Sequence, residues 1–270
     1  MLKYRKHLFI LFSLSLFFQS SVYGLTDRYR CMWQDDPATT MVIGWDQQSG
    51  HSPVVYYDLV NWGTDIFSYN FSKEVDNRVQ AKGMNNYFAR LTNLHPNTVY
   101  YFIIKDSEGL SRRLSFKTAP DNSSIPLSII AGGDSRNHRT ARRNANMTVA
   151  KLRPHCVMFG GDMTGGDDAR GWQGWMDDWQ HTIAEDGRMT PIIPARGNHE
   201  ESNQSILDLF DIKFSNLYYG LTMGGDMLRI YTLNSLIATG GDQKEWLARD
   251  LSRNDYVKWK FAQYLSLIHI

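Results

Sequence analysis

The sequence predicts a protein of two parts, an all-β sandwich followed by an α/β domain. Between residues 27 and 118, short alternating or apolar runs are separated by turn residues at short intervals, as in β-sandwiches. After residue 126, apolar strands that end in glycine alternate with helical stretches, which is typical of a parallel sheet with crossover helices. A segment with proline and serine, residues 120–126, lies between the two patterns and predicts a linker.

Composition limits the classes of function. The 270 residues are 42% hydrophobic, enough for one or two globular domains. The formal net charge is +1, so the chain carries no electrostatic signature for polyanions, and we expect no nucleic-acid partner.

The first 24 residues have the pattern of a secretory signal peptide. Three basic residues precede an apolar run, residues 8–18, and a small-residue cleavage site ends at Gly24. The alternative is a transmembrane anchor, but the run is shorter than the roughly 20 residues that span a bilayer. The sequence therefore predicts a mature chain that starts at Leu25, carries no membrane span, and is secreted, periplasmic or bound at the cell surface.

Only two cysteines are present, Cys31 and Cys156, and they fall in different predicted domains. A disulfide between them is not expected. Cys156 lies in an apolar strand, where a small buried hydrophobe is the better interpretation.

The first domain, predicted over residues 25–119, contains five clear strand patterns: TTMVIGWD, PVVYYDLV, NNYFARLT, TVYYFIIKD and RRLSFKT. One stretch is more specific. The segment LTNLHPNTVYYFIIKDSEG resembles the fibronectin type III pattern, in which Leu94, Pro96, Thr98 and Tyr100 form a tyrosine corner. The resemblance implies that Tyr100 buries its ring and hydrogen-bonds backward along the chain.

The second domain repeats a strand, a polar turn and a helix. Strands are predicted at 127–134, 156–162 and 189–193, with helices at 140–152 and 169–184. Two further strands, LRIYTLNS and YVKWKFAQY, flank a helix, QKEWLARDL. In parallel sheets of this kind, ligands bind beyond the carboxyl ends of the strands.

Polar side chains follow the first three strands at that edge: Gly-Gly-Asp134, Gly-Gly-Asp162 and Gly-Asn198-His199-Glu200. The glycines let the backbone turn sharply, so that short side chains can point into a shared crevice. Carboxylates, an amide oxygen and an imidazole suit hard or borderline divalent cations. The alternative is that both aspartates cap the following helices and that His199 is a surface residue.

The ordered set GD…GD…GNHE resembles the metallophosphoesterase (calcineurin-like) signature. With a fibronectin-like sandwich ahead of it, the chain resembles the purple acid phosphatases up to about Tyr264. This resemblance implies an α/β metallophosphoesterase domain, with mixed β-sheets flanked by helices, over residues 127–264.

The resemblance also implies roles for the strand-end residues. Asp134 would bind a first metal ion, Asn198 a second, and Asp162 both. A hydroxide bridging the two ions would attack phosphorus. His199 would contact a phosphate oxygen or protonate the leaving alcohol, and Glu200 would orient it. The cofactors implied are two divalent ions, Mn, Zn or Fe, whose identity the ligand types leave open.

Two positions depart from the family pattern. The tyrosine that ligates iron in purple enzymes is replaced by Gly165, so the resemblance does not carry over a purple iron centre. Arg136 stands where the family has His or Gly. Its guanidinium suits a bidentate grip on phosphate, although an exposed loop arginine is the alternative. His138 is equally well explained as a phosphate contact or as a solvated loop residue.

Several residues on or near the first two helices have functional and structural interpretations. Asp167 and Asp168 are interpreted as capping and solvating the second helix rather than as auxiliary metal ligands. Three tryptophans at helical spacing predict packing rather than a sugar platform: Trp172, Trp175 and Trp179. Three arginines predict a solvated face rather than a substrate approach: Arg139, Arg142 and Arg143.

The end of the sequence suggests that the second domain is incomplete at its C-terminus. The family supplies further histidine ligands from later strands, whereas His269 is the one histidine here after His199. The last six residues, LSLIHI, match the in-frame translation of a transposase sequencing adapter, so we interpret 265–270 as adapter-derived. A divergent natural C-terminus is the alternative. The fragment as written is expected to bind metal weakly and to be inactive.

These observations predict an exported, dinuclear-metal phosphoesterase that hydrolyses phosphomonoesters, with a small phosphate ester as its partner. Phosphodiester or nucleotide hydrolysis at the same site is an alternative. A second alternative, from another class, is a surface-binding protein with a degenerate phosphatase domain.

Overall fold

The computed structural model of the chain describes residues 25–238 and 240–266. The predicted signal peptide and His269 lie outside these residues. Within the described ranges, no helix has the length and apolar character needed to cross a bilayer.

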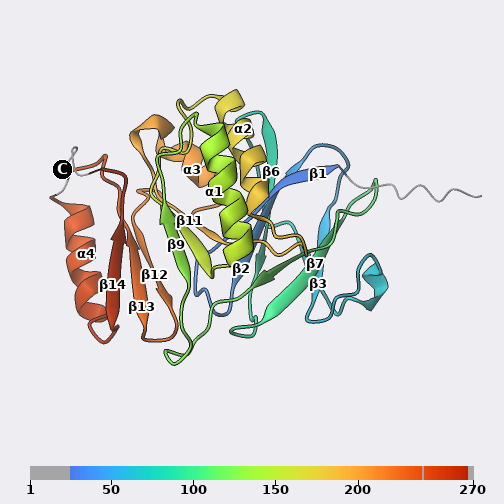
Figure 1. Cartoon of the computed structure of the whole chain (residues 1–270), viewed down its shortest axis with the longest axis horizontal. Helices are drawn as coiled ribbons and strands as arrows, with labels where there is room; N and C mark the ends of the chain where they lie inside the picture. The colour runs from blue at the N-terminus through green and yellow to red at the C-terminus, as the bar shows by residue number, and fades with distance from the viewer. Residues whose placement is uncertain (1–24, 239, 267–270) are drawn as a thin grey trace, which may run out of the picture.

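The N-terminal part is a sandwich of two antiparallel sheets (Figure 1). One sheet has the order β1 (Thr26–Met32), β2 (Met41–Gln47), β6 (Met84–Leu91) and β5 (Asn77–Ala81). The other has the order β4 (Phe71–Glu74), β3 (Val54–Asp58), β7 (Val99–Lys105) and β8 (Leu114–Lys117), with a 3-10 turn at Ile66–Ser68 before β4. Strand β2 is buried at every position because both of its faces are covered.

The predicted tyrosine corner is present in this sandwich. The ring of Tyr100 is buried, and it stacks on Phe116 with the ring planes 15° apart. Its hydroxyl oxygen accepts a hydrogen bond of 2.8 Å from the backbone N–H of His95, five residues upstream. The contact ties the start of β7 to the preceding loop, and the sequence-based expectation is confirmed.

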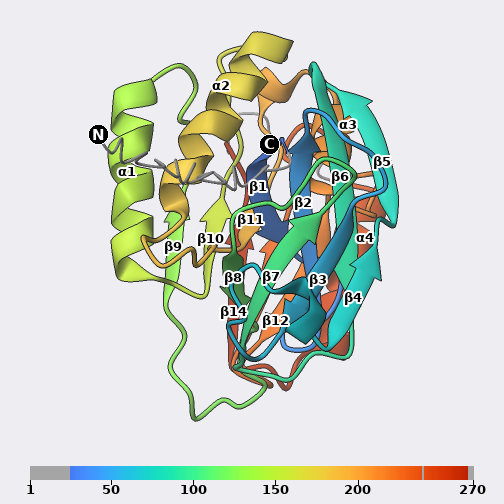
Figure 2. The same ribbon diagram turned by 90° about the vertical axis from the view of Figure 1, so that its right-hand side faces the viewer.

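The second part begins with a parallel sheet in the order β11 (Ile192–Pro194), β10 (Cys156–Phe159) and β9 (Ile129–Gly132). Phe159 is paired with Gly132 on one side and with Pro194 on the other, so the three strands end at the same level. Two helices connect them, α1 (Arg139–Leu152) and α2 (Ala169–Trp179), the latter continuing into a 3-10 turn at Gln180–Thr182. In Figure 2, α2 lies between α1 and the sandwich.

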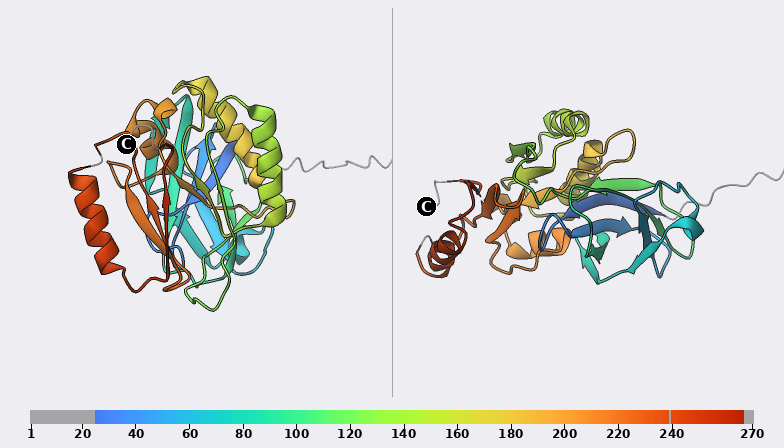
Figure 3. Two further views of the ribbon diagram at one scale, coloured as in Figure 1. Left: turned by 60° about the vertical axis from the view of Figure 1, so that its left-hand side comes forward. Right: turned by 90° about the horizontal axis from the view of Figure 1, so that it is seen from below.

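The rest of the chain forms a second, mixed sheet. Strand β13 (Leu228–Thr232) pairs antiparallel with β12 (Tyr219–Met223) and parallel with β14 (Trp259–Gln263). Two further helices are α3 (Asn203–Phe210) and α4 (Asp242–Arg253), and α4 lies at the end of the molecule opposite the sandwich (Figures 1 and 3). The Gln263 side-chain amide donates to the carbonyl of Ile193, which joins this sheet to β11.

The two parts of the chain share one continuous apolar core. Arg30 of β1 is fully buried, and its guanidinium donates to the Leu209 carbonyl of α3 at 2.6 Å and to the Asn86 side chain at 2.6 Å. Burial lowers the pKa of Arg30 to about 9. At the tip of the β5–β6 hairpin, the Lys82 ammonium lies 3.0 Å from the Asp167 carboxylate. The sandwich is therefore packed against the second part rather than tethered by a linker alone.

The expected solvated arginine face on α1 is found only in part, because Arg142 is buried whereas the side chains of Arg139 and Arg143 are 46% and 44% exposed. All three arginines pair instead with one carboxylate of α2, Asp178, which is 1% exposed: Arg139 at 2.8 Å, Arg142 at 2.6 Å and Arg143 at 2.7 Å. Burial alone would raise the pKa of Asp178, but hydrogen bonds from three guanidinium groups hold it well below its usual range.

The tryptophan prediction is confirmed, because all three side chains are buried: Trp172, Trp175 and Trp179. The rings of Trp175 and Trp179 stack with their centroids 5.2 Å apart. Cys31 and Cys156 are also buried, and both are free thiols.

Replacing Asp178 with Asn is expected to destabilise the fold by about 3 kcal/mol at neutral pH, because Arg142 would be left buried without a counter-charge. Guanidinium chloride unfolding measures the change. Glu245→Gln, which removes an exposed pair with Arg249, is the matched control and should change stability by less than about 0.5 kcal/mol.

The pH dependence of this difference follows from the depressed pKa of Asp178. A carboxyl whose folded pKa lies below its unfolded value, about 3.9, stabilises the fold above that pH and loses the effect as the pH falls further. The gap between wild type and Asp178→Asn should therefore be constant from neutral pH to about pH 5 and shrink below about pH 4. A gap that widens in acid would contradict this account.

Candidate active site

Three turns meet beyond the carboxyl ends of β9, β10 and β11, and glycine makes their close approach possible. Gly161 has φ 102°, and a Cβ there would lie 2.5 Å from the backbone nitrogen of Gly197. A Cβ on Gly197 would lie 2.1 Å from Oδ1 of Asp162. Any larger residue would push the turns apart, so the glycines are required by packing as well as by backbone conformation.

The first two turns are held to each other by their backbones. The N–H of Asp134 donates to the Gly161 carbonyl at 2.8 Å, and the N–H of Arg136 donates to the Asp162 carbonyl at 3.0 Å. Asp134 and Asp162 both have φ 51°, a left-handed conformation that aspartate tolerates. Their side chains differ in environment, because that of Asp162 is fully buried and that of Asp134 is 58% exposed.

Arg136 lies across both of these aspartates. Its Nε donates to Oδ1 of Asp134 at 2.6 Å, and its Nη2 is 3.2 Å from Oδ2 of Asp162. The second contact is an ion pair without hydrogen-bond geometry, so the buried Oδ2 of Asp162 accepts no hydrogen bond from a described residue. The positive charge in the crevice is therefore supplied by the chain itself.

His199 is fixed at its backbone and at one ring nitrogen. Its N–H donates to Oδ1 of Asp162 at 3.0 Å. Its Nδ1 is 2.9 Å from the Gly165 carbonyl, which can only accept, so Nδ1 carries a proton. The other ring nitrogen, Nε2, lies 3.8 Å from Oδ2 of Asp162. Asn198, directly before it, is exposed, and its amide forms no hydrogen bond with any described residue.

Glu200 acts on the backbone rather than on the imidazole. Its Oε2 accepts from the N–H groups of Asp162 at 3.0 Å and Gly197 at 2.6 Å, and its Oε1 accepts from Met163 at 2.6 Å. Burial raises the pKa of Glu200, while the three backbone hydrogen bonds oppose that shift. The family resemblance implied that Glu200 orients His199, but the contacts show it clamping the second and third turns together.

Three further residues named in the sequence analysis, Asp167, Asp168 and His138, have contacts that explain them by structure or lie exposed. Asp168 caps α2 by accepting from the Gly171 N–H at 2.9 Å. Asp167 accepts from Nε1 of Trp172 at 2.7 Å and pairs with Lys82. The capping and solvating interpretation of Asp168 is therefore confirmed, and Asp167 is engaged in packing contacts. His138 is exposed at the start of α1, and its side chain does not cap the helix.

Two contacts at this edge were not anticipated from the sequence. A Cβ on Gly165 would lie 2.3 Å from the Asn137 amide nitrogen, so Asn137 fills the space beside this residue. Leu265, which the sequence analysis placed in the tail, packs on Gly197, where a Cβ would lie 2.8 Å from its Cδ2. The chain that follows β14 thus reaches the edge of the three turns.

The donor set at this edge fits a hard divalent cation in part. Among the described residues, no group of three or more His, Cys, Asp or Glu forms a metal cluster. A buried carboxylate oxygen without a hydrogen bond, on Asp162, and an exposed amide on Asn198 are oxygen donors of the kind that such cations take. The guanidinium of Arg136 contacts the carboxylates of Asp134 and Asp162, and it would have to move before a cation could bind there.

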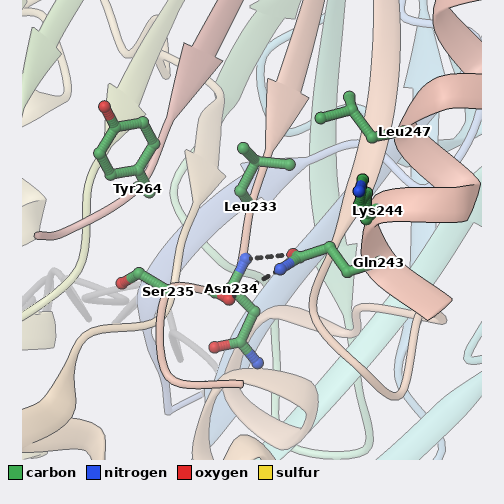
Figure 4. Close-up of a pocket in the computed structure, with 7 residues that line it drawn as sticks. All are labelled: Leu233, Asn234, Ser235, Gln243, Lys244, Leu247 and Tyr264. Carbon is green, nitrogen blue, oxygen red and sulfur yellow. Dashed lines mark hydrogen bonds between the residues drawn. The ribbon is translucent and has the colours of Figure 1, made fainter. Parts of the chain in front are cut away.

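A separate cavity of about 220 Å³ lies beside α4 (Figure 4). It is lined by Leu233, Asn234, Ser235, Gln243, Lys244, Leu247 and Tyr264. The Asn234 and Gln243 groups are tied to each other by two hydrogen bonds, of 2.8 and 3.1 Å. None of the lining residues is an acid or a histidine, so this cavity has no ligands for metal chemistry.

Comparison with known proteins supports a phosphatase-like fold. Residues 26–118 match the family described as "Purple acid Phosphatase, N-terminal domain". The chain is similar to the purple acid phosphatase PPD1 from yellow lupin (Lupinus luteus) seeds, with a TM-score of 0.71 and 13% identity over 88% of this chain and 50% of that one.

It is also similar to PhoD, with a TM-score of 0.64 and 14% identity over 91% of this chain and 62% of that one. The chain thus spans between half and two thirds of the length of these structures. No curated protein matches the sequence significantly. The N-terminal sandwich thus matches the N-terminal domain of purple acid phosphatases, and the chain is similar in fold to the matched parts of these two structures.

Glu200→Gln is expected to destabilise the chain by about 1–3 kcal/mol, because an amide N–H would face a backbone N–H that now donates to a carboxylate. Chemical denaturation measures the loss. Glu185→Gln, at an exposed position, serves as the control and should be nearly neutral. Equal stability of the two variants would show that the clamp is unimportant.

Proposed function

We propose that the protein is a metal-dependent phosphoesterase that hydrolyses phosphate monoesters in the manner of an acid phosphatase. The observation that carries this proposal is the meeting of Asp134, Asp162, Asn198 and His199 at one sheet edge, in a fold similar to a purple acid phosphatase. The proposal includes export, which rests on the N-terminal sequence.

In this proposal, Asp134, Asp162 and Asn198 would hold two divalent cations. Bound cations supply Lewis acidity toward the phosphate ester and neutralise its charge. The chain contributes the buried Asp162 carboxylate, whose Oδ2 accepts no hydrogen bond from a described residue, so a cation that replaced Arg136 there would complete its coordination.

His199 is suited to a role in proton transfer or phosphate binding. Because its Nδ1 is tied to the Gly165 carbonyl, the ring is held in one orientation with Nε2 on the side of Asp162. With Nδ1 protonated, Nε2 accepts a proton in the neutral ring, and in the imidazolium form it can donate to a phosphate oxygen or to the leaving alcohol. Glu200 supports this arrangement indirectly, through the backbone of the turns.

Arg136 is suited to contact the substrate phosphate. Its side chain is 43% exposed, so it can exchange the carboxylates for an oxyanion without uncovering the core. The planar guanidinium matches two phosphate oxygens at once.

Arg136 also favours a second candidate function, that of a phosphate-binding protein without turnover. The guanidinium already offsets one of the two negative charges of Asp134 and Asp162, so the crevice has a cation even without metal. Metal-dependent turnover separates the two candidates.

Asp162→Ala in the full-length gene product is expected to lower hydrolysis of an aryl phosphate at least about 100-fold, and chelation of metal should have the same effect. Asp168→Asn, which changes a helix cap, is the control and should retain activity. Activity that survives Asp162→Ala would refute the mechanism, and a wild-type protein that binds phosphate but never turns over would support the binding protein.

Arg136→Gln is expected to tighten Mn²⁺ binding by about tenfold, because a positive charge in contact with the predicted ligands competes with the ion. Calorimetric titration measures this affinity without reference to activity. Arg253→Gln, on α4, removes the same charge far along the chain and is the control. Unchanged or weaker binding by Arg136→Gln would show that the guanidinium does not compete with metal.

A further inference from the structure

A polar cavity of about 300 Å³ opens beside the three turns, where the starts of α1 and α2 face each other. It is lined by Asn137, Arg139, Arg142, Asp168, Arg170, Gly171 and Gly174. Unlike the cavity beside α4, it is rich in guanidinium groups, and neither the family resemblance nor the proposed function uses it.

The cavity carries an excess of positive charge. Arg139, Arg142 and Arg143 share the single carboxylate of Asp178. Arg170 is exposed and forms no interaction with a described residue, and the one other carboxylate at the cavity is that of Asp168. Four guanidinium groups against two carboxylates leave two positive charges, which matches a dianion.

Several hydrogen-bond donors at the cavity have no acceptor among residues 25–238 and 240–266. Arg139 uses Nε and Nη2 on Asp178, while its Nη1 forms no hydrogen bond. The Arg170 guanidinium and the Asn137 amide are likewise without hydrogen bonds to described residues. The start of α2 faces the same space, but its positive end is already capped by the Asp168 carboxylate, so the arginine and amide donors carry the preference for an anion.

Arg142 plays a different part, because its guanidinium is already saturated. It donates through Nη2 to Asp178 at 2.6 Å and through Nη1 to the carbonyl of Arg136 at 2.5 Å. It therefore supports both the cavity wall and the loop that carries Arg136.

The cavity shares a wall with the predicted site. Asn137 follows Arg136 directly, and its side chain packs on Gly165, whose carbonyl binds His199. A molecule whose ester phosphate lay at the three turns could thus place a neighbouring group in the cavity.

We propose that this cavity binds a second phosphate group of the same substrate, so that the preferred substrates are compounds with two phosphates. The inference rests on the proposed phosphoesterase function for its catalytic part, whereas binding of the second anion stands on the cavity alone. We assign to Arg170 the preference for substrates with two phosphates, because its side chain forms no interaction with a described residue that would give it a structural role.

The test compares a sugar bisphosphate with an aryl monophosphate, using the full-length gene product. Arg170→Gln should lower kcat/KM for the bisphosphate about tenfold more than for the aryl phosphate, as expected for loss of one charge-assisted hydrogen bond. Arg253→Gln is the matched control and should leave the ratio unchanged. An unchanged ratio in Arg170→Gln would overturn the inference.

A second measurement separates this inference from the proposed function. Pyrophosphate is titrated calorimetrically into chelator-treated protein at low salt. Wild type should bind it, and Arg170→Gln should bind about tenfold more weakly. This result in a protein without hydrolytic activity would uphold the anion site and reject the phosphoesterase. Absent binding, or equal binding by both proteins, would overturn the anion site even in an active enzyme.

Discussion

The candidate site depends on one constraint, the contact of backbone with backbone between consecutive turns. Gly161 lies against Gly197. The carboxylate of Glu200 fills the remaining space and accepts hydrogen bonds from backbone N–H groups of the second and third turns. Buried N–H groups that lack a partner are costly, so the glutamate is needed as soon as the turns come this close. The positions of Asp162 and His199 then follow from the backbone, with little left to side-chain freedom.

Charge balance is the second theme, and it differs between the start of α1 and the loop that precedes it. Near the start of α1, Asp178 neutralises only part of the arginine cluster, which leaves the neighbouring cavity positive. In the loop before it, Arg136 offsets one of the two negative charges of Asp134 and Asp162. The loop therefore keeps a reduced negative charge, and the first turn of α1, a few residues later, keeps a positive one.

Much of the fold was predictable because its signals are local. Apolar runs and helical periodicity indicated α1, α2, α4 and the three parallel strands. Strand β5, NRVQA, has too few apolar residues to stand out, and β12 is interrupted by Gly220. Helix α3 has only eight residues. The burial of Arg142 and the pairing of the arginine cluster could not be predicted, because the partner, Asp178, lies more than 30 residues away on another helix, and no local pattern shows which faces meet. Likewise, the residue types identified the strand-end set, but only the folded chain showed that Glu200 binds the backbone and that Asn137 fills the space at Gly165.

The contact between Lys82 and Asp167 has a consequence for how such proteins can be assembled from parts. The hairpin tip of the sandwich holds the loop that follows Asp162, and Arg30 donates to the backbone at the end of α3. A chimaera joined at residues 120–126 would lose these cross-contacts and would interrupt the apolar core that the two parts share. The sandwich and the second part of the chain are therefore best exchanged together. Among related proteins, substitutions at the hairpin tip and in the loop that follows Asp162 should co-vary.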